Sequence, residues 1–129
     1  MRKGLRNVHF LGHSWGSWQA VGYGLTNAEV RPSLILYSTI AEPHEFTCTG
    51  NSRHWSRLAD MHKIKVPVLI MVGQHDKQAP ASGVDMKLHL EKPEFAKFPT
   101  SSRSPYDDDP ALYCQALRDF FDLNTHRPR

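Results

Sequence analysis

The 129-residue sequence predicts an α/β domain of about four mostly parallel strands flanked by helices. Short apolar runs alternate with segments of helical periodicity along most of the chain. A Gly-His-Ser-Trp-Gly motif at residues 12–16 lies between the first apolar run and the first helical segment. The strongest apolar run, residues 68–72, ends in a turn that carries Asp76. Because open α/β sheets hold their chemistry at the carboxyl ends of the strands, we expect a site there, in a single domain spanning residues 1–129.

The first part of the chain is predicted to form a strand, a helix and a second strand. Residues 8–11 are a short apolar run typical of a buried strand, and residues 18–25 repeat apolar side chains at helical spacing. A polar connection at residues 26–32 ends in proline, after which residues 33–38 again indicate a buried strand. Two parallel strands joined by a helix form a βαβ unit. Residues 41–52 have no steady period and predict either a loop or the remnant of a larger segment.

The middle of the chain predicts two further strands, each preceded by a helix. A weak helix is expected over residues 53–62, before the strong strand at residues 68–72. A second helix is expected over residues 81–90, before a short last strand at residues 94–98. This order continues the alternation that a parallel sheet requires.

A turn-rich segment, residues 99–109, leads into the last predicted helix. Asp109 is a good N-cap, and Pro110 fits the first helical position because its fixed φ suits a helix and its missing N–H costs nothing there. The core face of this helix is expected to comprise five apolar residues: Leu112, Ala116, Leu117, Phe120 and Phe121.

The motif at residues 12–16 is typical of the nucleophile elbow of α/β-hydrolases. A serine hydroxyl is a weak nucleophile, so it must be presented where a base can take its proton and where backbone N–H groups can bind the developing oxyanion. A strained strand-to-helix turn presents Ser14 in this way. The same turn is expected to crowd Gly12 and Gly16 until little but glycine fits at either position.

The order of these segments resembles the C-terminal portion of α/β-hydrolases, and more narrowly the proline iminopeptidase family of aminopeptidases. Residues 11–17 are similar to the elbow of that family. Residues 45–50, Trp55 and residues 64–76 are similar to its approach to the acid residue, and residues 102–110 are similar to its histidine loop and last helix. These stretches extend over nearly the whole chain.

The resemblance implies a role for Ser14 as nucleophile and for Asp76 as the acid of a catalytic triad. It implies that the backbone N–H of Trp15 supplies one oxyanion donor. The base should be a histidine, but Arg103 stands at that position. A guanidinium remains protonated and cannot accept the serine proton.

Four histidines are alternative candidates for the base. His89 and His126 follow Asp76 in the sequence, His13 occupies the variable position of the motif beside Ser14, and His75 precedes Asp76. Each is interpreted as a surface or packing histidine rather than as a base.

The resemblance also implies two segments that this sequence lacks. One is the early part of the fold, with the glycine-rich loop that gives the second oxyanion donor. The other is the helical cap that such aminopeptidases use to bind the free amine of the substrate, for which residues 40–45 leave no room. The elbow strand is therefore expected at an edge of the sheet.

An exposed apolar edge is a template for pairing with another chain, so we expect a homo-oligomer formed through residues 7–11. Three aromatic residues of the elbow helix are expected to add to a sticky surface: Trp15, Trp18 and Tyr23.

Composition limits the class of protein. The formal net charge is +3 and the pI about 9.0, but only the tail at residues 126–129 is locally basic, so no nucleic-acid partner is expected. No segment has the length and hydropathy of a membrane span or a signal peptide, which predicts a cytoplasmic protein without membrane contact. Cys48 and Cys114 are expected to be free, partly buried thiols, and no metal or cofactor is expected.

These observations predict a serine hydrolase of the iminopeptidase-like or aminopeptidase-like kind, weak or inactive as this chain, whose substrate would be a small ester or peptide. The alternative is a catalytically dead remnant that acts as a binding or self-assembling module.

Overall fold

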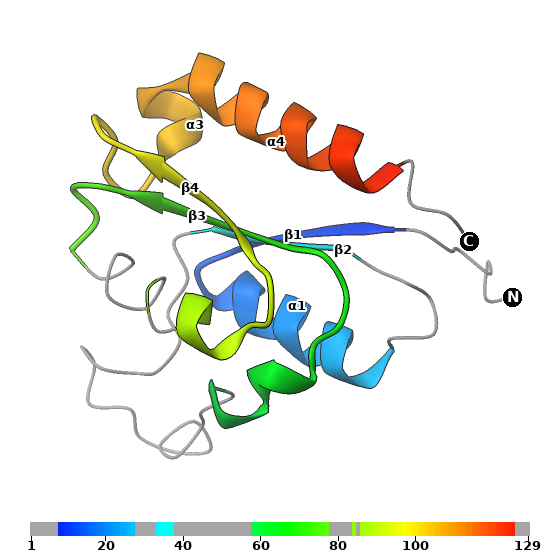
Figure 1. The fold of residues 1–129 in the computed structure, drawn as a ribbon. Helices are drawn as coiled ribbons and strands as arrows, with labels where there is room; N and C mark the ends of the chain where they lie inside the picture. The colour runs from blue at the N-terminus through cyan, green and yellow to red at the C-terminus, as the bar shows by residue number, and fades with distance from the viewer. Residues whose placement is uncertain (1–7, 28–32, 38–57, 78–83, 85, 126–129) are drawn as a thin grey trace, which may run out of the picture.

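The computed structural model describes residues 8–27, 33–37, 58–77, 84 and 86–125. Within these ranges the chain forms one parallel sheet whose strand order follows the sequence, which confirms the predicted fold class (Figure 1). The strands are β1 (His9–His13), β2 (Ser33–Tyr37), β3 (Val68–Gly73) and β4 (Glu94–Phe98).

The elbow strand β1 lies at one edge of this sheet, as expected. It pairs with β2 alone among the described strands, with Gly12 opposite Leu36. Every residue of β2 and β3 is buried, whereas most of β1 is not. The continuous apolar runs of β2 and β3 are typical of parallel strands covered on both faces.

Helices cover the two faces of the sheet (Figure 1). One face carries α1 (Trp15–Thr26), the 3-10 helix η3 (Leu58–Lys63) and a helical segment at residues 86–89. The opposite face carries α4 (Pro110–Thr125), preceded by the short helix α3 (Pro105–Asp108). None of the described helices is long and apolar enough to cross a membrane.

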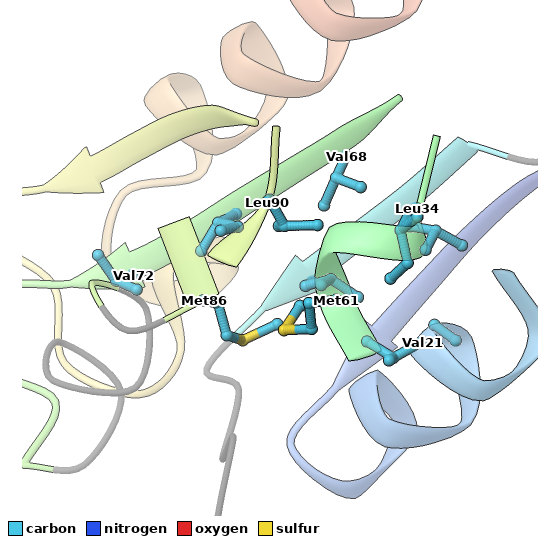
Figure 2. Close-up of a cluster of buried hydrophobic side chains, with 11 residues drawn as sticks. Val21, Leu34, Met61, Val68, Val72, Met86 and Leu90 are labelled. Carbon is cyan, nitrogen blue, oxygen red and sulfur yellow. The ribbon is translucent and has the colours of Figure 1, made fainter. Parts of the chain in front are cut away.

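The alternation of side chains along β2 and β3 divides the core in two, because successive residues of a strand point to opposite faces. The larger cluster lies under α1 and gathers Leu34 and Val68 from the sheet with Val21 from α1. Figure 2 shows Met61 and Met86 meeting within it, from η3 and the helical segment that follows β3. Unbranched methionine side chains suit an irregular gap between two short helices.

The smaller cluster lies under α4. Ile35, Leu69 and Met71 supply its sheet side, and Phe120 is the fully buried anchor from the helix. Asp109 caps α4 as predicted, since its Oδ1 accepts a hydrogen bond from the Leu112 N–H at 3.2 Å.

One predicted core position of α4 is wrong. Leu112 is 39% exposed, whereas Ala116, Leu117 and Phe121 pack against the cluster as expected. Tyr113 occupies the first position of the packed face instead. Residues 113 and 116 lie on one face of the helix because they are three residues apart. Leu112 precedes Tyr113 by one residue, which places it about 100° around the helix from that face.

The structure corrects three other expectations. Trp18 is only 9% exposed and belongs to the core rather than to a sticky surface, because it shares the inner face of α1 with Val21 at spacing three. Cys114 is a free thiol, as predicted, but it is exposed because it lies on the outer side of α4. The turn-rich segment contains the helix α3, which starts at a proline and lasts a single turn.

Several expectations lie outside the described residues. They include the loop at residues 41–52, residues 53–57 of the weak helix, residues 81–83 and 85 of the second predicted helix, residue 7 of the pairing edge, Cys48 and His126.

Candidate functional site

Ser14 occupies a strained turn between β1 and α1. Its φ is 54° and its ψ is −115°, the one positive φ found for a non-glycine residue in the described part of the chain. Such backbone conformations cost about 1–3 kcal/mol and persist only where the surroundings hold them. Here the Ser14 N–H donates to the Tyr37 carbonyl at the end of β2, at 3.0 Å. The turn therefore holds the hydroxyl at the carboxyl end of the sheet.

Gly12 is required by this turn. A Cβ at Gly12 would lie 2.5 Å from the Gly16 carbonyl oxygen and 2.6 Å from the Ser17 nitrogen. The hydroxyl of Ser17 donates to the Gly12 carbonyl at 2.7 Å, which holds the end of β1 against the start of α1. The expected crowding is thus present at Gly12.

The same expectation is wrong for Gly16. A Cβ at Gly16 would meet nothing within 4 Å in the described part of the chain. The crowding is one-sided, because the backbone of Gly16 presses on the α-carbon of Gly12, while the direction in which a Gly16 side chain would project is open.

Asp76 follows β3 and is buried. The turn that carries it is tied to the next loop, since the Gln74 N–H donates to the Phe98 carbonyl and the His75 N–H donates to the Ser101 carbonyl, both at 2.9 Å. Gly73 permits this contact, because a Cβ there would lie 1.8 Å from the Ser102 carbonyl oxygen.

The loop after β4 carries Arg103. Ser102 is held by Asp108 of α3, whose Oδ2 accepts hydrogen bonds from the Ser102 N–H at 2.9 Å and from its hydroxyl at 3.1 Å. The carbonyl of Arg103 itself accepts a hydrogen bond from the Tyr37 hydroxyl. The short helix α3 and the end of β2 therefore fix the position of this loop.

These three segments bring Ser14, Asp76 and Arg103 together. Arg103 Nη2 donates to Ser14 Oγ at 2.6 Å, and its Nη1 lies 3.9 Å from Asp76 Oδ1. The guanidinium thus lies between the serine and the carboxylate. This is the place that a base would take in a triad, but a guanidinium can only donate there.

Trp15 is the first residue of α1, directly after Ser14. The residue is 51% exposed, and its ring packs against Trp18 with ring centroids 4.3 Å apart. Exposure of Trp15 agrees with the expected apolar surface, while the role of its N–H stays a prediction.

The described histidines do not hydrogen-bond to Ser14. His13 stacks on Tyr37 at 4.7 Å, so one face of its ring is covered although the residue as a whole is exposed. Its pKa is lowered from 6.5, first by partial burial and then by the positive charge of Arg103, while the negative charge of Asp76 opposes the shift. His75 and His89 are exposed.

Tyr37 was not singled out from the sequence. The available signal was its position at the end of a predicted strand, where the carboxyl edge of the sheet begins.

No group of three or more metal-ligating side chains lies together within the ranges that the structure describes.

Comparison with known proteins finds relatives of one kind. The sequence is 27% identical over 85 residues to a proline iminopeptidase from Heyndrickxia coagulans, a match that covers 66% of this chain and 30% of the relative. It is 26% identical over 86 residues to a proline iminopeptidase from Saccharolobus solfataricus, covering 67% of this chain and 28% of the relative. The chain thus spans less than a third of the curated relatives that it matches. No protein-family model matches the sequence.

Solved structures share the fold. The structure of VinJ superposes with a TM-score of 0.81 at 13% identity, covering 92% of this chain and 67% of that one. An α/β hydrolase enzyme from a sediment metagenome of the Mar Chica lagoon, Morocco, superposes with a TM-score of 0.80 at 18% identity, covering 95% and 64%. The chain therefore has an α/β-hydrolase fold and resembles proline iminopeptidases at low identity.

Proposed function

Starting from the α/β-hydrolase fold, we propose that this chain carries the site of a proline iminopeptidase-like serine hydrolase whose turnover is weak or absent. Ser14 takes the nucleophile position, Asp76 the acid position and Arg103 the base position. The observation that supports this assignment is the 2.6 Å hydrogen bond from Arg103 Nη2 to Ser14 Oγ. A small ester or peptide is the proposed substrate class.

The chemistry explains why turnover is limited. For acyl transfer, the serine proton must leave as Oγ attacks the carbonyl carbon, and it must then reach the leaving group. Arg103 can do neither, because it has no lone pair to accept that proton. The proposed oxyanion donor, the N–H of Trp15 at the start of α1, does not depend on the base, and sites without a complete triad retain some rate over water.

The test is covalent labelling of Ser14 by a fluorophosphonate probe. We expect slow or undetectable labelling of the natural chain and faster labelling of Arg103→His, because imidazole can accept the proton at the same place. In the Arg103→His background, Ser14→Ala should abolish the label. Arg118→His, which makes the same exchange on the exposed side of α4, should behave like the natural chain. Equal labelling of Arg103→His and the natural chain would contradict the proposal.

The alternative function, a binding or self-assembling module, is supported by the edge position of β1. Leu11 of this strand is 48% exposed. Two copies could pair through residues 7–11 and extend the sheet across a two-fold axis. Sedimentation velocity should then give a dimer that Leu11→Lys dissociates, because a charge blocks edge pairing. Leu123→Lys, on an exposed position of α4, is the control, and a strict monomer of the natural chain would exclude this arrangement.

We further propose that residues 1–129 form a single domain in the cytoplasm. A single domain should unfold in one cooperative transition in urea. A cytoplasmic protein should be recovered in the cytoplasmic fraction after cell fractionation.

A further inference from the structure

Tyr37 contacts two of the three segments that meet at the proposed site, the turn at Ser14 and the loop that carries Arg103. It is the last residue of β2 and is only 1% exposed. Its backbone carbonyl accepts the hydrogen bond from the Ser14 N–H at 3.0 Å, while its hydroxyl donates to the carbonyl oxygen of Arg103. One side chain and its own backbone therefore connect the elbow to the loop that carries residue 103.

The ring of Tyr37 has little freedom to move. His13 stacks on it at 4.7 Å with an interplanar angle of 25°. Tyr106 and Tyr113 contact it edge-on, with centroids at 5.9 and 6.2 Å. A buried aromatic ring held by three other rings places its hydroxyl at a defined point.

Further hydrogen bonds hold the two residues that precede Arg103 in the loop. The Ser101 carbonyl is bound by the His75 N–H, and Ser102 is bound by Asp108. The bond from Tyr37 acts on the backbone of residue 103, from which the side chain reaches Ser14. Losing this bond would allow that backbone to shift, and shifts of about 1 Å between reacting groups can cost up to about 100-fold in rate.

We propose that Tyr37 is a positioning residue, which sets the distance between Ser14 and the side chain at position 103. The proposal rests on the proposed function, because it treats position 103 as the base position. It implies that the site keeps the geometry of a triad even though the residue at its centre cannot act as a base.

The first experiment measures positioning through chemistry. In the full chain with Arg103→His, Tyr37→Phe removes the hydroxyl but keeps the ring and the backbone bond to Ser14. We expect the limiting rate of fluorophosphonate labelling to fall about tenfold, with the probe concentration at half-saturation unchanged. Tyr113→Phe, which removes a hydroxyl from a ring packed against the same side chain, should change the rate less than about twofold. Equal rates for the two tyrosine variants would overturn the proposal.

The second experiment needs no activity. Trypsin cleaves after an arginine only when the backbone around it can leave its folded position, and the Arg103 side chain is 41% exposed. In the natural chain, Tyr37→Phe should speed cleavage of the 103–104 bond about fivefold or more relative to Tyr113→Phe, with similar unfolding midpoints in urea. Unchanged cleavage would overturn the positioning role.

The two readouts separate the two proposals. Faster cleavage together with no labelling of Arg103→His would mean that Tyr37 holds the loop while the proposed hydrolase site is wrong. Normal labelling of Arg103→His, unaffected by Tyr37→Phe, would leave the proposed function standing and remove the positioning role.

Discussion

Gly73→Ala tests how tightly the acid turn and the Arg103 loop are packed. The added Cβ would lie 1.8 Å from the Ser102 carbonyl oxygen and 2.8 Å from the Ser101 carbonyl oxygen. Both neighbours are backbone atoms, so no side chain can rotate away. The Ser102 carbonyl would have to retreat by about 1.2 Å to reach 3.0 Å, which is still a tight contact.

The cost follows from what that retreat breaks. The His75 N–H and the Ser101 carbonyl are hydrogen-bonded at 2.9 Å across this contact, and a backbone hydrogen bond contributes about 1 kcal/mol net. Overpacking a close backbone contact adds about 1–3 kcal/mol. We therefore expect the free energy of unfolding to fall by about 3 kcal/mol, which corresponds to a fall of roughly 10 °C in Tm for a domain of this size.

Urea unfolding followed by circular dichroism provides the measurement, with Gly22→Ala as the matched control. Gly22 lies inside α1, where a Cβ would meet nothing within 4 Å among the described residues. The same substitution should therefore raise the free energy of unfolding there by about 0.5–1 kcal/mol, because alanine favours a helix over glycine. If Gly73→Ala is as stable as the natural chain, the acid turn and the Arg103 loop are not packed as closely as described.

Three further predictions follow from other contacts. His13 should titrate below 6.5 by NMR, and Arg103→Met should raise its pKa by removing a repelling charge. Between the lowered pKa of folded His13 and 6.5, the folded state binds fewer protons than the unfolded state. The contribution of His13 to the free energy of unfolding should therefore fall as the pH drops through this range, and it should be constant above pH 6.5. Gly12→Ala should cost about 2–4 kcal/mol in urea unfolding and, in the Arg103→His background, abolish labelling, because its Cβ would lie 2.5 Å from the backbone of α1; retained stability would refute the tight elbow. Phe120→Ala should cost about 3–5 kcal/mol, whereas Leu112→Ala should stay within about 0.5 kcal/mol, and equal losses would contradict the packed face of α4.

The sheet was predictable because its signals are local. Residues 34–37 and 68–72 are continuous apolar runs, and a strand buried on both faces needs such a run whatever lies around it. The elbow was predictable for a similar reason, since the motif at residues 12–16 encodes a strand, a turn and a helix within a few bonds.

Other features depend on which surface a segment meets. The pattern of α4 allowed either Leu112 or Tyr113 to start the buried face, and packing against the sheet selected Tyr113. Trp18 became a core residue because the inner face of α1 includes it. Glycine is required at residue 12 and not at residue 16, because a Cβ at Gly12 would point at the backbone of Gly16, whereas a Cβ at Gly16 would point into open space. No local pattern distinguishes these outcomes.

The sequence by itself determined the alternating sheet and helices, the serine at the turn between the first strand and helix, and the arginine at residue 103, because these depend on local periodicity and on residue identity. Only the tertiary structure decided that Arg103, 89 residues after Ser14, donates to the Ser14 hydroxyl beside Asp76. It also decided that Tyr37 connects the turn at Ser14 to the loop that carries Arg103. The physical reason is that parallel strands bring the residues at their carboxyl ends to one edge, whereas the contacts made there depend on the packing of loops far apart in the chain.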